Sequence, residues 1–396
     1  MYVERDVLRE FERAKSIYNA VALVGVRQAG KTTFLKEKAK GLNSSYILFD
    51  DPDARALFDE DIKRFDRQYV EGYEVAILDE VGYCKDAGSK LKYLVDIGRK
   101  LWLTSSSEVL LEEKVLSYLV GRVSVLRLYP FSLPELLAAR GQKELTPSIL
   151  QRLVWEHMMY GGFPKVVLTE EIEAKRMILR DLQETMLLKD VARTFGIQNL
   201  PPLESLVRYL AVSAGEILNY EKVCREVGIS FPTLKKYLDA LEKSYLIRRV
   251  RPFTRNPRKE MSKRPKIYFI DTGLRNLVAK VFQEDGKTFE NYIFTELLKA
   301  GQDPRYWRTK GGAEVDFVVE TDTGPVPIEV KLEARVGEVG AGLRSFIENY
   351  RCGKALVITY KGESGEAERG GCKIIYSDPL SFRYHLKSPL NISECL

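Results

Sequence analysis

The sequence is poor in histidine, with only His157 and His385 among 396 residues. Chemistry that depends on a histidine general base is therefore disfavoured, and metal chemistry would have to use carboxylates. Five cysteines are present and none of them forms a C-x-x-C pair, so we interpret them as buried thiols and not as ligands of structural zinc.

Long apolar runs are also lacking. No stretch of about 18 apolar residues occurs, so no membrane span is predicted. The first residues, MYVERDVLREFERA, are charged throughout, which is unlike a secretory signal. We therefore expect a cytoplasmic protein without a membrane partner. A length of 396 residues predicts two or three domains, and the net charge of +6 is mild enough that its distribution matters more than its sum.

Residues 20–135 alternate short apolar segments with helical stretches. The apolar segments are NAVALVGV, SSYILFD, YEVAILDE, KLWLTSSS and RVSVLRLYP. Near-continuous apolar strands separated by helices are typical of a parallel sheet buried on both faces. The sequence therefore predicts an α/β domain at this end of the chain.

The segment GVRQAGKTT matches the phosphate-binding pattern G-x-x-x-x-G-K-[ST] after a strand and before a helix. Backbone N–H groups and the helix N-terminus would hold the phosphates, Lys31 would reach the β- and γ-phosphates, and the Thr32 hydroxyl would ligate Mg²⁺. The alternative is a glycine-rich turn that binds nothing. The expected nucleotide-binding residues are Gly25, Gln28, Ala29, Gly30, Lys31, Thr32, Thr33 and Asp79.

Two carboxylates end the buried strand VAILDE. Burying two carboxylates costs free energy unless each has a partner or a ligand. We therefore predict that Asp79 holds Mg²⁺ through water and that Glu80 polarises the attacking water. An ordinary acidic pair at a strand end is the alternative.

Two further catalytic residues are predicted in the same domain. Ser106, with Thr104 and Ser105 nearby, ends the next strand and could contact the γ-phosphate, unless it only caps the strand. Arg122 follows a glycine and could act as an arginine finger, within its own chain or from a neighbouring subunit of a homo-oligomer. The alternative for Arg122 is a solvated surface arginine.

Residues 203–270 read as three helices followed by two strands, the pattern of a winged helix. Between Arg248 and Lys266 the chain carries nine basic residues and one acidic residue, a formal charge of +8 that suits DNA phosphates. A lid over the nucleotide or a protein-contact module is the alternative. The expected DNA-binding residues are Lys235, Lys236, Arg255, Arg258 and Lys259.

The C-terminal part pairs carboxylates with a lysine. We predict that Glu314, Asp316 and Val318 share one strand face, with Val315, Phe317 and Val319 on the other. On the following strand, Glu329 and Lys331 share a face. Asp316, Glu329 and helical Glu290 would then hold Mg²⁺ or Mn²⁺, and Lys331 would be catalytic. A solvated acidic and basic cross-strand pair is the alternative.

The order of these motifs carries a resemblance. GVRQAGKTT, FDDPDAR, ILDE, LTSSS, LVGR with LYPFSLPE, and YGGFPKVV together resemble the prokaryotic AAA+-like ATPase family, over essentially the whole chain. The resemblance implies ATP as the nucleotide. TSSS departs from the Thr-Gly-Ser often found in that family. The spacing D-x(12)-E-x-K behind a helix resembles the PD-(D/E)XK nuclease core, with Val315 in place of the proline.

These observations predict four segments. Residues 1–140 form the P-loop AAA+-like core, 141–202 a helical lid or linker, 203–272 a winged helix, and 273–396 a restriction-endonuclease-like domain. The expected function is Mg²⁺-dependent hydrolysis of ATP to ADP coupled to action on DNA, with metal-dependent cleavage. The alternatives are a regulatory ATPase switch whose C-terminal domain only binds DNA or a protein partner, and a transcription regulator.

Overall fold

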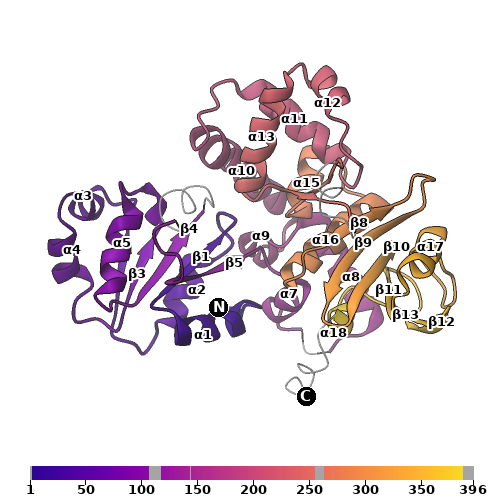
Figure 1. The fold of residues 1–396 in the computed structure, drawn as a ribbon, viewed down its shortest axis with the longest axis horizontal. Coiled ribbons are helices and arrows are strands. Elements are labelled where there is room, and N and C mark those ends of the chain that lie inside the picture. Colours follow the sequence, from indigo (N-terminus) through magenta and orange to yellow (C-terminus); the bar gives the residue numbers. More distant parts are fainter. Residues whose placement is uncertain (1, 107–116, 143, 255–262, 387–396) are drawn as a thin grey trace. The chain divides into compact units, whose positions relative to one another are not determined.

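The structure is a computed structural model that describes residues 2–106, 117–142, 144–254 and 263–386 (Figure 1). The chain packs as two compact units. Unit 1 contains residues 1–131, 184–197 and 239–246, and unit 2 contains residues 132–183, 198–238 and 247–396. These units are defined by packing, and the four expected segments stay a prediction.

Unit 1 is built on a five-stranded sheet in the order β2-β3-β4-β1-β5, in which every pairing is parallel. The strands are β1 (Ala20–Gly25), β2 (Ser44–Leu48), β3 (Val75–Asp79), β4 (Leu101–Ser105) and β5 (Val123–Leu128). Every residue of β1, β3 and β4 is buried, as expected for a parallel sheet covered on both faces. The predicted α/β fold and all five strands are confirmed.

Helices surround this sheet in unit 1. They are α1 (Leu8–Ile17), α2 (Lys31–Lys38), α3 (Pro52–Glu60), α4 (Ile62–Tyr69), the short η1 (Val81–Tyr83), α5 (Ala87–Asp96) and the π-helix η3 (Met186–Arg193). One apolar core joins α1 and α2 to the sheet, where Phe11 contacts Phe34 and Trp102 edge to face. Residues 26–30 join the end of β1 to the N-terminus of α2.

Unit 2 begins with helices and a two-stranded ladder. The helices are α7 (Leu133–Ala139), α8 (Pro147–Tyr160), α9 (Pro164–Leu168), α10 (Ile172–Thr185), α11 (Leu200–Val212), α12 (Tyr220–Val227), α13 (Phe231–Lys243) and α15 (Thr272–Ala279). The last residues of α10 and of α13 belong to unit 1. The strands β6 (Ile247–Val250) and β7 (Lys266–Phe269) pair antiparallel. The predicted order of three helices and two strands is therefore present at α11–β7, and its DNA-binding role stays a prediction.

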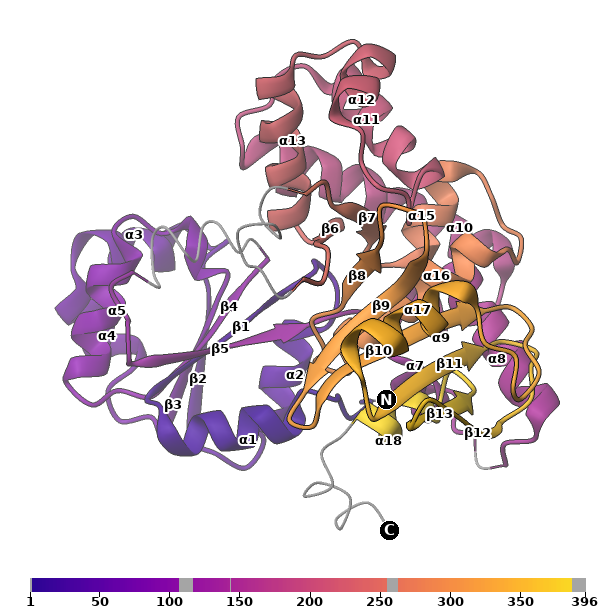
Figure 2. The same ribbon diagram turned by 45° about the vertical axis from the view of Figure 1, so that its right-hand side comes forward.

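The C-terminal part of unit 2 is a six-stranded mixed sheet in the order β12-β13-β11-β10-β9-β8 (Figure 2). Its elements are α16 (Gly286–Lys299), β8 (Arg305–Arg308), β9 (Glu314–Thr321), β10 (Gly324–Lys331), α17 (Ala341–Tyr350), β11 (Lys354–Thr359), β12 (Gly365–Arg369), β13 (Cys372–Ser377) and α18 (Phe382–Leu386). The sequence predicted all but β12 and α18. Strand β12 escapes notice because its residues, GEAER, are polar and none of them is buried.

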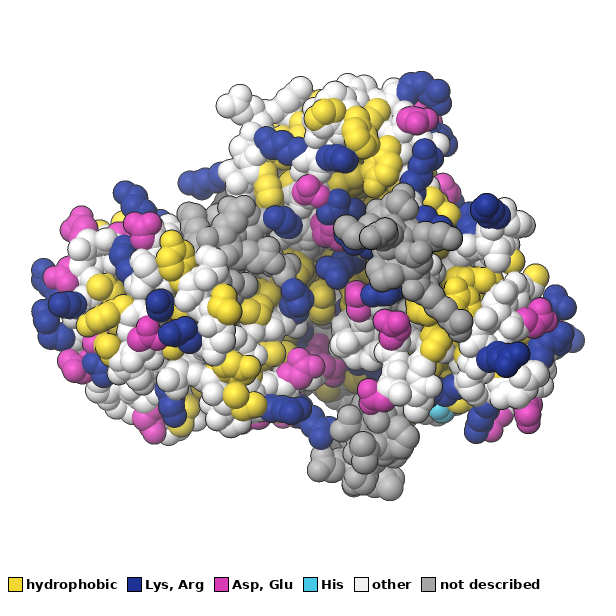
Figure 3. All heavy atoms as spheres, in the orientation of Figure 1, with side chains coloured by type: hydrophobic (Ala, Val, Ile, Leu, Met, Phe, Trp, Pro, Cys, Tyr) yellow, Lys and Arg dark blue, Asp and Glu magenta, His cyan; other side chains and the backbone are white. Residues whose placement is uncertain are grey.

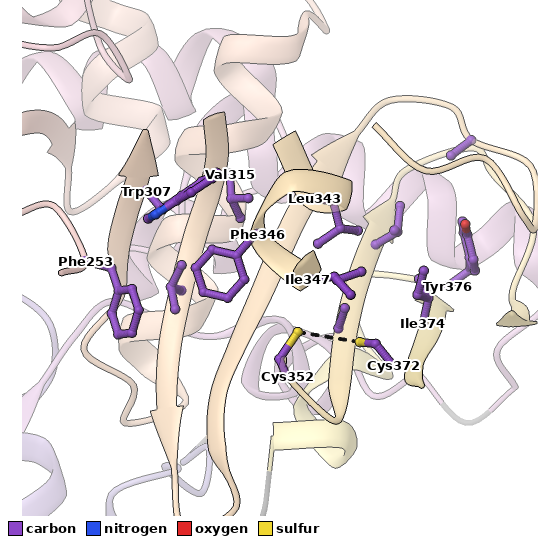
Figure 4. Close-up of a cluster of buried hydrophobic side chains, with 14 residues drawn as sticks. Phe253, Trp307, Val315, Leu343, Phe346, Ile347, Cys352, Cys372, Ile374 and Tyr376 are labelled. Atoms are coloured by element: carbon purple, nitrogen blue, oxygen red, sulfur yellow. Dashed lines mark hydrogen bonds between the residues drawn. The ribbon is translucent and has the colours of Figure 1, made fainter. Parts of the chain in front are cut away.

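Helix α17 covers one face of this sheet (Figure 4). Its residues Leu343 and Phe346 pack with Val315 and Trp307 in an apolar cluster that also holds Cys352 and Cys372. The two sulfur atoms lie 3.6 Å apart and both cysteines are free thiols. The expectation of buried thiols is thus met for this pair and for Cys84, whereas Cys224 is half-buried.

Strand β9 contains an irregularity that changes which side chains share a face. Arg305 pairs with Val318 and Trp307 pairs with Val315, so two steps along β8 match three along β9. The extra residue is a β-bulge, which reverses the alternation of side chains beyond it. Val315 and Val318 both pack on the α17 side, whereas Phe317 packs against Tyr268 and Phe294. The predicted sharing of one face by Val315 and Phe317 is therefore wrong.

Within the described residues, the helices are all too short or too polar to cross a membrane.

Candidate active site

The phosphate-binding loop lies between β1 and α2, and its backbone needs glycine at both ends. Gly25 has φ 140°, and a Cβ there would lie 2.1 Å from the carbonyl oxygen of Leu128 on the neighbouring strand. Gly30 has φ 98° and precedes the first residue of α2. Gln28 is left-handed as well, with φ 59°, a strained conformation for a residue with a side chain. The loop therefore has the tight turn that lets backbone N–H groups surround a phosphate.

Lys31 is buried in this loop. Its Nζ atom donates to the carbonyl oxygens of Gly25 at 2.9 Å and Val26 at 3.0 Å, and its burial lowers its pKa. Arg5 braces the loop by donating to the oxygens of Ala29 and Tyr129, each at 2.7 Å. The expected nucleotide-binding residues thus lie together, although Thr33 is exposed in the first turn of α2.

Asp79 is buried at the end of β3 and receives three side-chain hydroxyls. Oδ2 accepts from Thr32 at 2.8 Å and from Tyr46 at 2.6 Å, and Oδ1 accepts from Thr104. Thr32 and Asp79 are therefore brought together from α2 and β3, as predicted. A hydroxyl beside a carboxylate under a phosphate loop fits the oxygen ligands that Mg²⁺ prefers.

Glu80 follows Asp79 in a left-handed conformation with φ 58°. Its Oε2 atom accepts from both the backbone N–H and the hydroxyl of Ser106, each at 3.1 Å. The backbone N–H of Glu80 donates to Thr104 at 3.0 Å. The structure thus joins Ser106 to the carboxylate of Glu80, and their catalytic roles stay predictions.

Two residues that the sequence analysis missed complete this site. Arg27, inside the loop, forms a two-pronged ion pair with Asp190 of η3, with Nε 2.9 Å from both carboxylate oxygens and Nη2 2.7 Å from Oδ1. Nη2 also lies 3.5 Å from the hydroxyl of Ser106 and 3.4 Å from that of Tyr83. The hydrogen bond with Asp190 raises the pKa of Arg27 above its ordinary value. The one signal in the sequence was a basic residue inside the phosphate-binding motif. Its partner could not be predicted, because Asp190 lies 163 residues further along the chain.

Arg122 lies at the other edge of the sheet. In the register of β1 and β5, Ala20 pairs with Val123, so Arg122 is beside the start of β1 whereas the phosphate loop follows its end. Its exposed guanidinium pairs with Asp96 at 2.6 Å. This position does not bring Arg122 to the phosphate loop of its own chain. A finger in a neighbouring subunit and a solvated surface arginine both stay predictions.

The predicted metal site in unit 2 has a lysine among its carboxylates. Lys266 of β7 is buried, and its Nζ atom lies 3.1 Å from Oε1 of Glu290 and 2.5 Å from Oε1 of Glu314. Tyr268 also donates to Glu290. Burial lowers the pKa of Lys266, but the charges of Glu290, Glu314 and Asp316 outweigh burial and raise it overall, so its ammonium form is favoured.

The other predicted ligands have protein partners of their own. Asp316 accepts from the backbone N–H of Val330 at 2.8 Å, while Glu329 pairs through Oε1 with Lys331 at 3.0 Å and lies beside Gly340. In the part of the chain that the structure describes, no three His, Cys, Asp or Glu residues are close enough to hold a metal ion. The predicted Mg²⁺ or Mn²⁺ site of Glu290, Asp316 and Glu329 therefore stays a prediction, now with Lys266 among its carboxylates.

Burial affects the charge of Asp316 directly. Its burial, together with the charge of Glu290, raises its pKa to about 7, against the opposing effects of Lys266 and the Val330 N–H. Lys331 is half-exposed; burial lowers its pKa, but its hydrogen bond with Glu329 and the charges of Glu329, Asp316 and Glu290 together outweigh burial and raise it.

Part of the predicted DNA-binding surface is described. Lys235 and Lys236 are exposed on the first turns of α13, and the Lys235 ammonium lies 4.7 Å from the ring centre of exposed Phe231. Figure 3 shows hydrophobic side chains exposed among basic ones over α11–α13, at the top of this view. Arg255, Arg258 and Lys259 lie outside the described residues. Lys266, counted in the basic stretch, is buried and ion-paired, so it is not part of this surface.

The fold and the loop together define unit 1 as a P-loop ATPase domain, an ATP-binding class of protein. Residues 18–137 match the family model described as "AAA domain". Residues 151–285 and 285–377 match two models described as domains of unknown function, DUF8612 and DUF4143.

Several relatives match most of this chain. It is 25% identical to an uncharacterized protein of Haemophilus influenzae, covering 95% of this chain and 97% of the relative. It is 27% identical to the uncharacterized protein Rv2008c of Mycobacterium tuberculosis, covering 92% and 81%. Among solved structures it is similar to the Walker-type ATPase PABY2304 of Pyrococcus abyssi, at 16% identity and TM-score 0.47, covering 68% of this chain and 93% of that one. This structural likeness is too weak to extend the assignment beyond the AAA domain.

Proposed function

We propose that this chain hydrolyses ATP with Mg²⁺ in unit 1. The observation that carries the proposal is the neighbouring pair Asp79 and Glu80, with Asp79 2.8 Å from the Thr32 hydroxyl and Glu80 held by Ser106. Thr32 and Asp79 would hold Mg²⁺, which supplies positive charge to the phosphates. Lys31 would bind the β- and γ-phosphates, and Glu80 would take the proton of the attacking water.

ATPase assays test this proposal. Lys31→Ala and Glu80→Gln should each lower turnover by about 100-fold or more, because one removes phosphate binding and the other the proton acceptor. Glu80→Gln should still bind ATP, whereas Lys31→Ala should not. If the unchanged chain turns over ATP no faster than both variants, the proposal is contradicted. Lys40→Ala, an exposed lysine of unit 1 near the end of α2, is the matched control.

We further propose that the ATPase acts on DNA, which unit 2 binds through the exposed start of α13. Lys235 and Lys236 supply charge, and Phe231 supplies an exposed ring. Of the two predicted roles for the C-terminal domain, binding is favoured over cleavage, since Lys266 neutralises the carboxylates. A nuclease assay with Mg²⁺ or Mn²⁺ decides: DNA cleavage that is lost in Asp316→Ala and Lys331→Ala would overturn the binding role.

Arg122 would complete the catalytic site of a neighbouring subunit in a homo-oligomer. This proposal is supported by its exposed position away from its own phosphate loop. Mixing Arg122→Ala with Lys31→Ala tests it, because a mixed oligomer can pair an intact loop with an intact arginine. Activity that recovers on mixing supports action from a neighbour, and the absence of recovery contradicts it.

A further inference from the structure

Arg27 occupies a position that the predicted catalytic groups do not explain. It is the third residue of the phosphate-binding motif, two positions after Gly25, and its side chain is 22% exposed. Its guanidinium lies between Asp190 on one side and the hydroxyls of Ser106 and Tyr83 on the other. An arginine is therefore anchored at the mouth of the loop.

Asp190, which holds Arg27 in place, carries a cost in free energy. Asp190 is buried, and a buried carboxylate needs a charged or hydrogen-bonded partner. Its segment, η3, is a π-helix, a rare geometry found frequently at functional sites. The backbone oxygen of Asp190 accepts from the Ser244 hydroxyl at 2.8 Å, so two chain segments distant in sequence, 184–197 and 239–246, meet here within unit 1.

The surroundings of Arg27 locate it relative to a bound nucleotide. A phosphate loop surrounds the β-phosphate, so the γ-phosphate must point outward toward Glu80, which faces the attacking water. Ser106 donates to Glu80 at 3.1 Å, and Nη2 of Arg27 is 3.5 Å from the Ser106 hydroxyl. The guanidinium thus lies next to the groups that would flank the γ-phosphate.

Arg27 also retains donors for a phosphate. A guanidinium has five N–H donors, and Asp190 engages Nε and Nη2. Nη1 makes no hydrogen bond within the described part of the chain. The arginine can therefore contact a phosphate oxygen without giving up Asp190.

We propose that Arg27 is a catalytic residue that donates to the γ-phosphate of ATP from within the loop, and that Asp190 is its positioning residue. The inference rests on the proposed ATP hydrolysis. In that reaction the water oxygen bonds to the γ-phosphorus, the bond to the β,γ-bridging oxygen breaks, and Glu80 accepts the water proton. ADP and inorganic phosphate leave. Arg27 stabilises the charge that develops on the γ-phosphate oxygens, the task of an arginine finger.

The test compares nucleotides that differ only in the γ-phosphate. Binding of ADP and of a non-hydrolysable ATP analogue is measured for the full chain, for Arg27→Ala and for Arg13→Ala, an exposed arginine of α1 that serves as the matched control. Arg27→Ala should weaken binding of the analogue by about 10-fold or more while ADP binding changes less than about 3-fold, because only the analogue presents the γ-phosphate. Equal weakening of both nucleotides, or of neither, would overturn the proposal.

Turnover separates a positioning role from a structural one. Asp190→Asn should lower kcat by about 10-fold with little change in KM, since the arginine is still present but less well held. Arg27→Lys should recover part of the loss in Arg27→Ala because it restores the charge without the two-pronged geometry. If the Arg27 and Asp190 variants lose thermal stability but keep the kcat of the unchanged chain, the ion pair between these residues only stabilises the position of η3.

The outcome is separable from failure of ATP hydrolysis itself. If the unchanged chain turns over ATP no faster than Lys31→Ala, the proposed function fails, and the ratio of analogue to ADP affinity in Arg27→Ala still decides whether the arginine contacts the γ-phosphate. If Arg27→Ala does not fold, the affinities for the ATP analogue and for ADP are compared in Arg27→Lys and Asp190→Asn instead.

Discussion

The ammonium nitrogen of Lys266 lies 3.1 Å from Oε1 of Glu290, so a buried lysine supplies positive charge to the carboxylates around β9. Lys266 comes from β7, Glu290 from α16 and Glu314 from β9. The charge of one buried side chain thus links the two-stranded ladder to the mixed sheet within unit 2.

Removing that charge is expected to destabilise the chain. Lys266→Met leaves Glu290, Glu314 and Asp316 without their shared cation and should lower the free energy of unfolding by about 3–5 kcal/mol at pH 8. The loss should be smaller at pH 5, where the carboxylates of the variant can bind protons. Urea unfolding at both pH values measures it, with exposed Lys310→Met as the control. An equal loss at both pH values would argue against an electrostatic cause.

Asp316 should make stability depend on pH. The folded-state pKa of Asp316 is about 7, above the usual value of an aspartate. Its contribution to the free energy of unfolding is therefore fully present below about pH 4 and is lost as pH rises through about 7. Each pKa unit corresponds to about 1.4 kcal/mol, which bounds the effect at roughly 4 kcal/mol.

The variant Asp316→Asn tests this dependence because its amide oxygen can still accept from the Val330 N–H. The unfolding free energy of the variant should fall less steeply between pH 4 and 7 than that of the unchanged chain. Asp322→Asn, in the turn of the same hairpin, is exposed and should leave the slope unchanged. Identical slopes for all three proteins would contradict a raised pKa.

Thr104 should matter for Mg²⁺ although it is no ligand. It donates to Asp79 and accepts from the Glu80 N–H, so Thr104→Val removes both contacts while keeping the volume. We expect the unfolding free energy to fall by about 1–3 kcal/mol, as for an unsatisfied buried group. ATP turnover should then need several-fold more Mg²⁺, which a Mg²⁺ titration measures. Ser89→Ala removes an exposed hydroxyl of α5 and should change neither quantity.

DNA binding should depend on salt through the start of α13. Each phosphate contact contributes about −0.9 to the slope of log K against log salt, so Lys235→Ala with Lys236→Ala should reduce the slope by about 2. Affinity should fall for all DNA sequences alike, because phosphates carry no sequence information. Fluorescence anisotropy at several salt concentrations measures it. Lys222→Ala on α12, whose lysine pairs with Glu226 at 3.8 Å, is the control, and an equal change there would deny α13 a special role.

The phosphate loop and its sheet could be predicted because their determinants are local. The pattern around Gly25, Gly30 and Lys31 dictates a turn that only glycine permits, and apolar strands without alternation dictate a sheet buried on both faces. Asp79 and Glu80 follow from the same strand. Parallel pairing then brings the ends of β3 and β4 together, which is why Ser106 reaches Glu80.

The carboxylate site of unit 2 could not be predicted in the same way. A period of two places side chains only while a strand is regular, and the bulge in β9 moves Phe317 to the face opposite Val315. Lys266 looked like one cation of an exposed basic stretch, and nothing local indicates that β7 carries it into a buried cluster.

The sequence by itself determined the ATPase domain, the order of its strands along the chain and the residues of its phosphate loop, because each depends on backbone conformation and apolar pattern over a few residues. Only the tertiary structure decided which charges meet: Arg27 with Asp190, and Lys266 with Glu290. The partners in those pairs are 163 and 24 residues apart, and the cost of burying an unpaired charge makes each pairing a property of the packed chain.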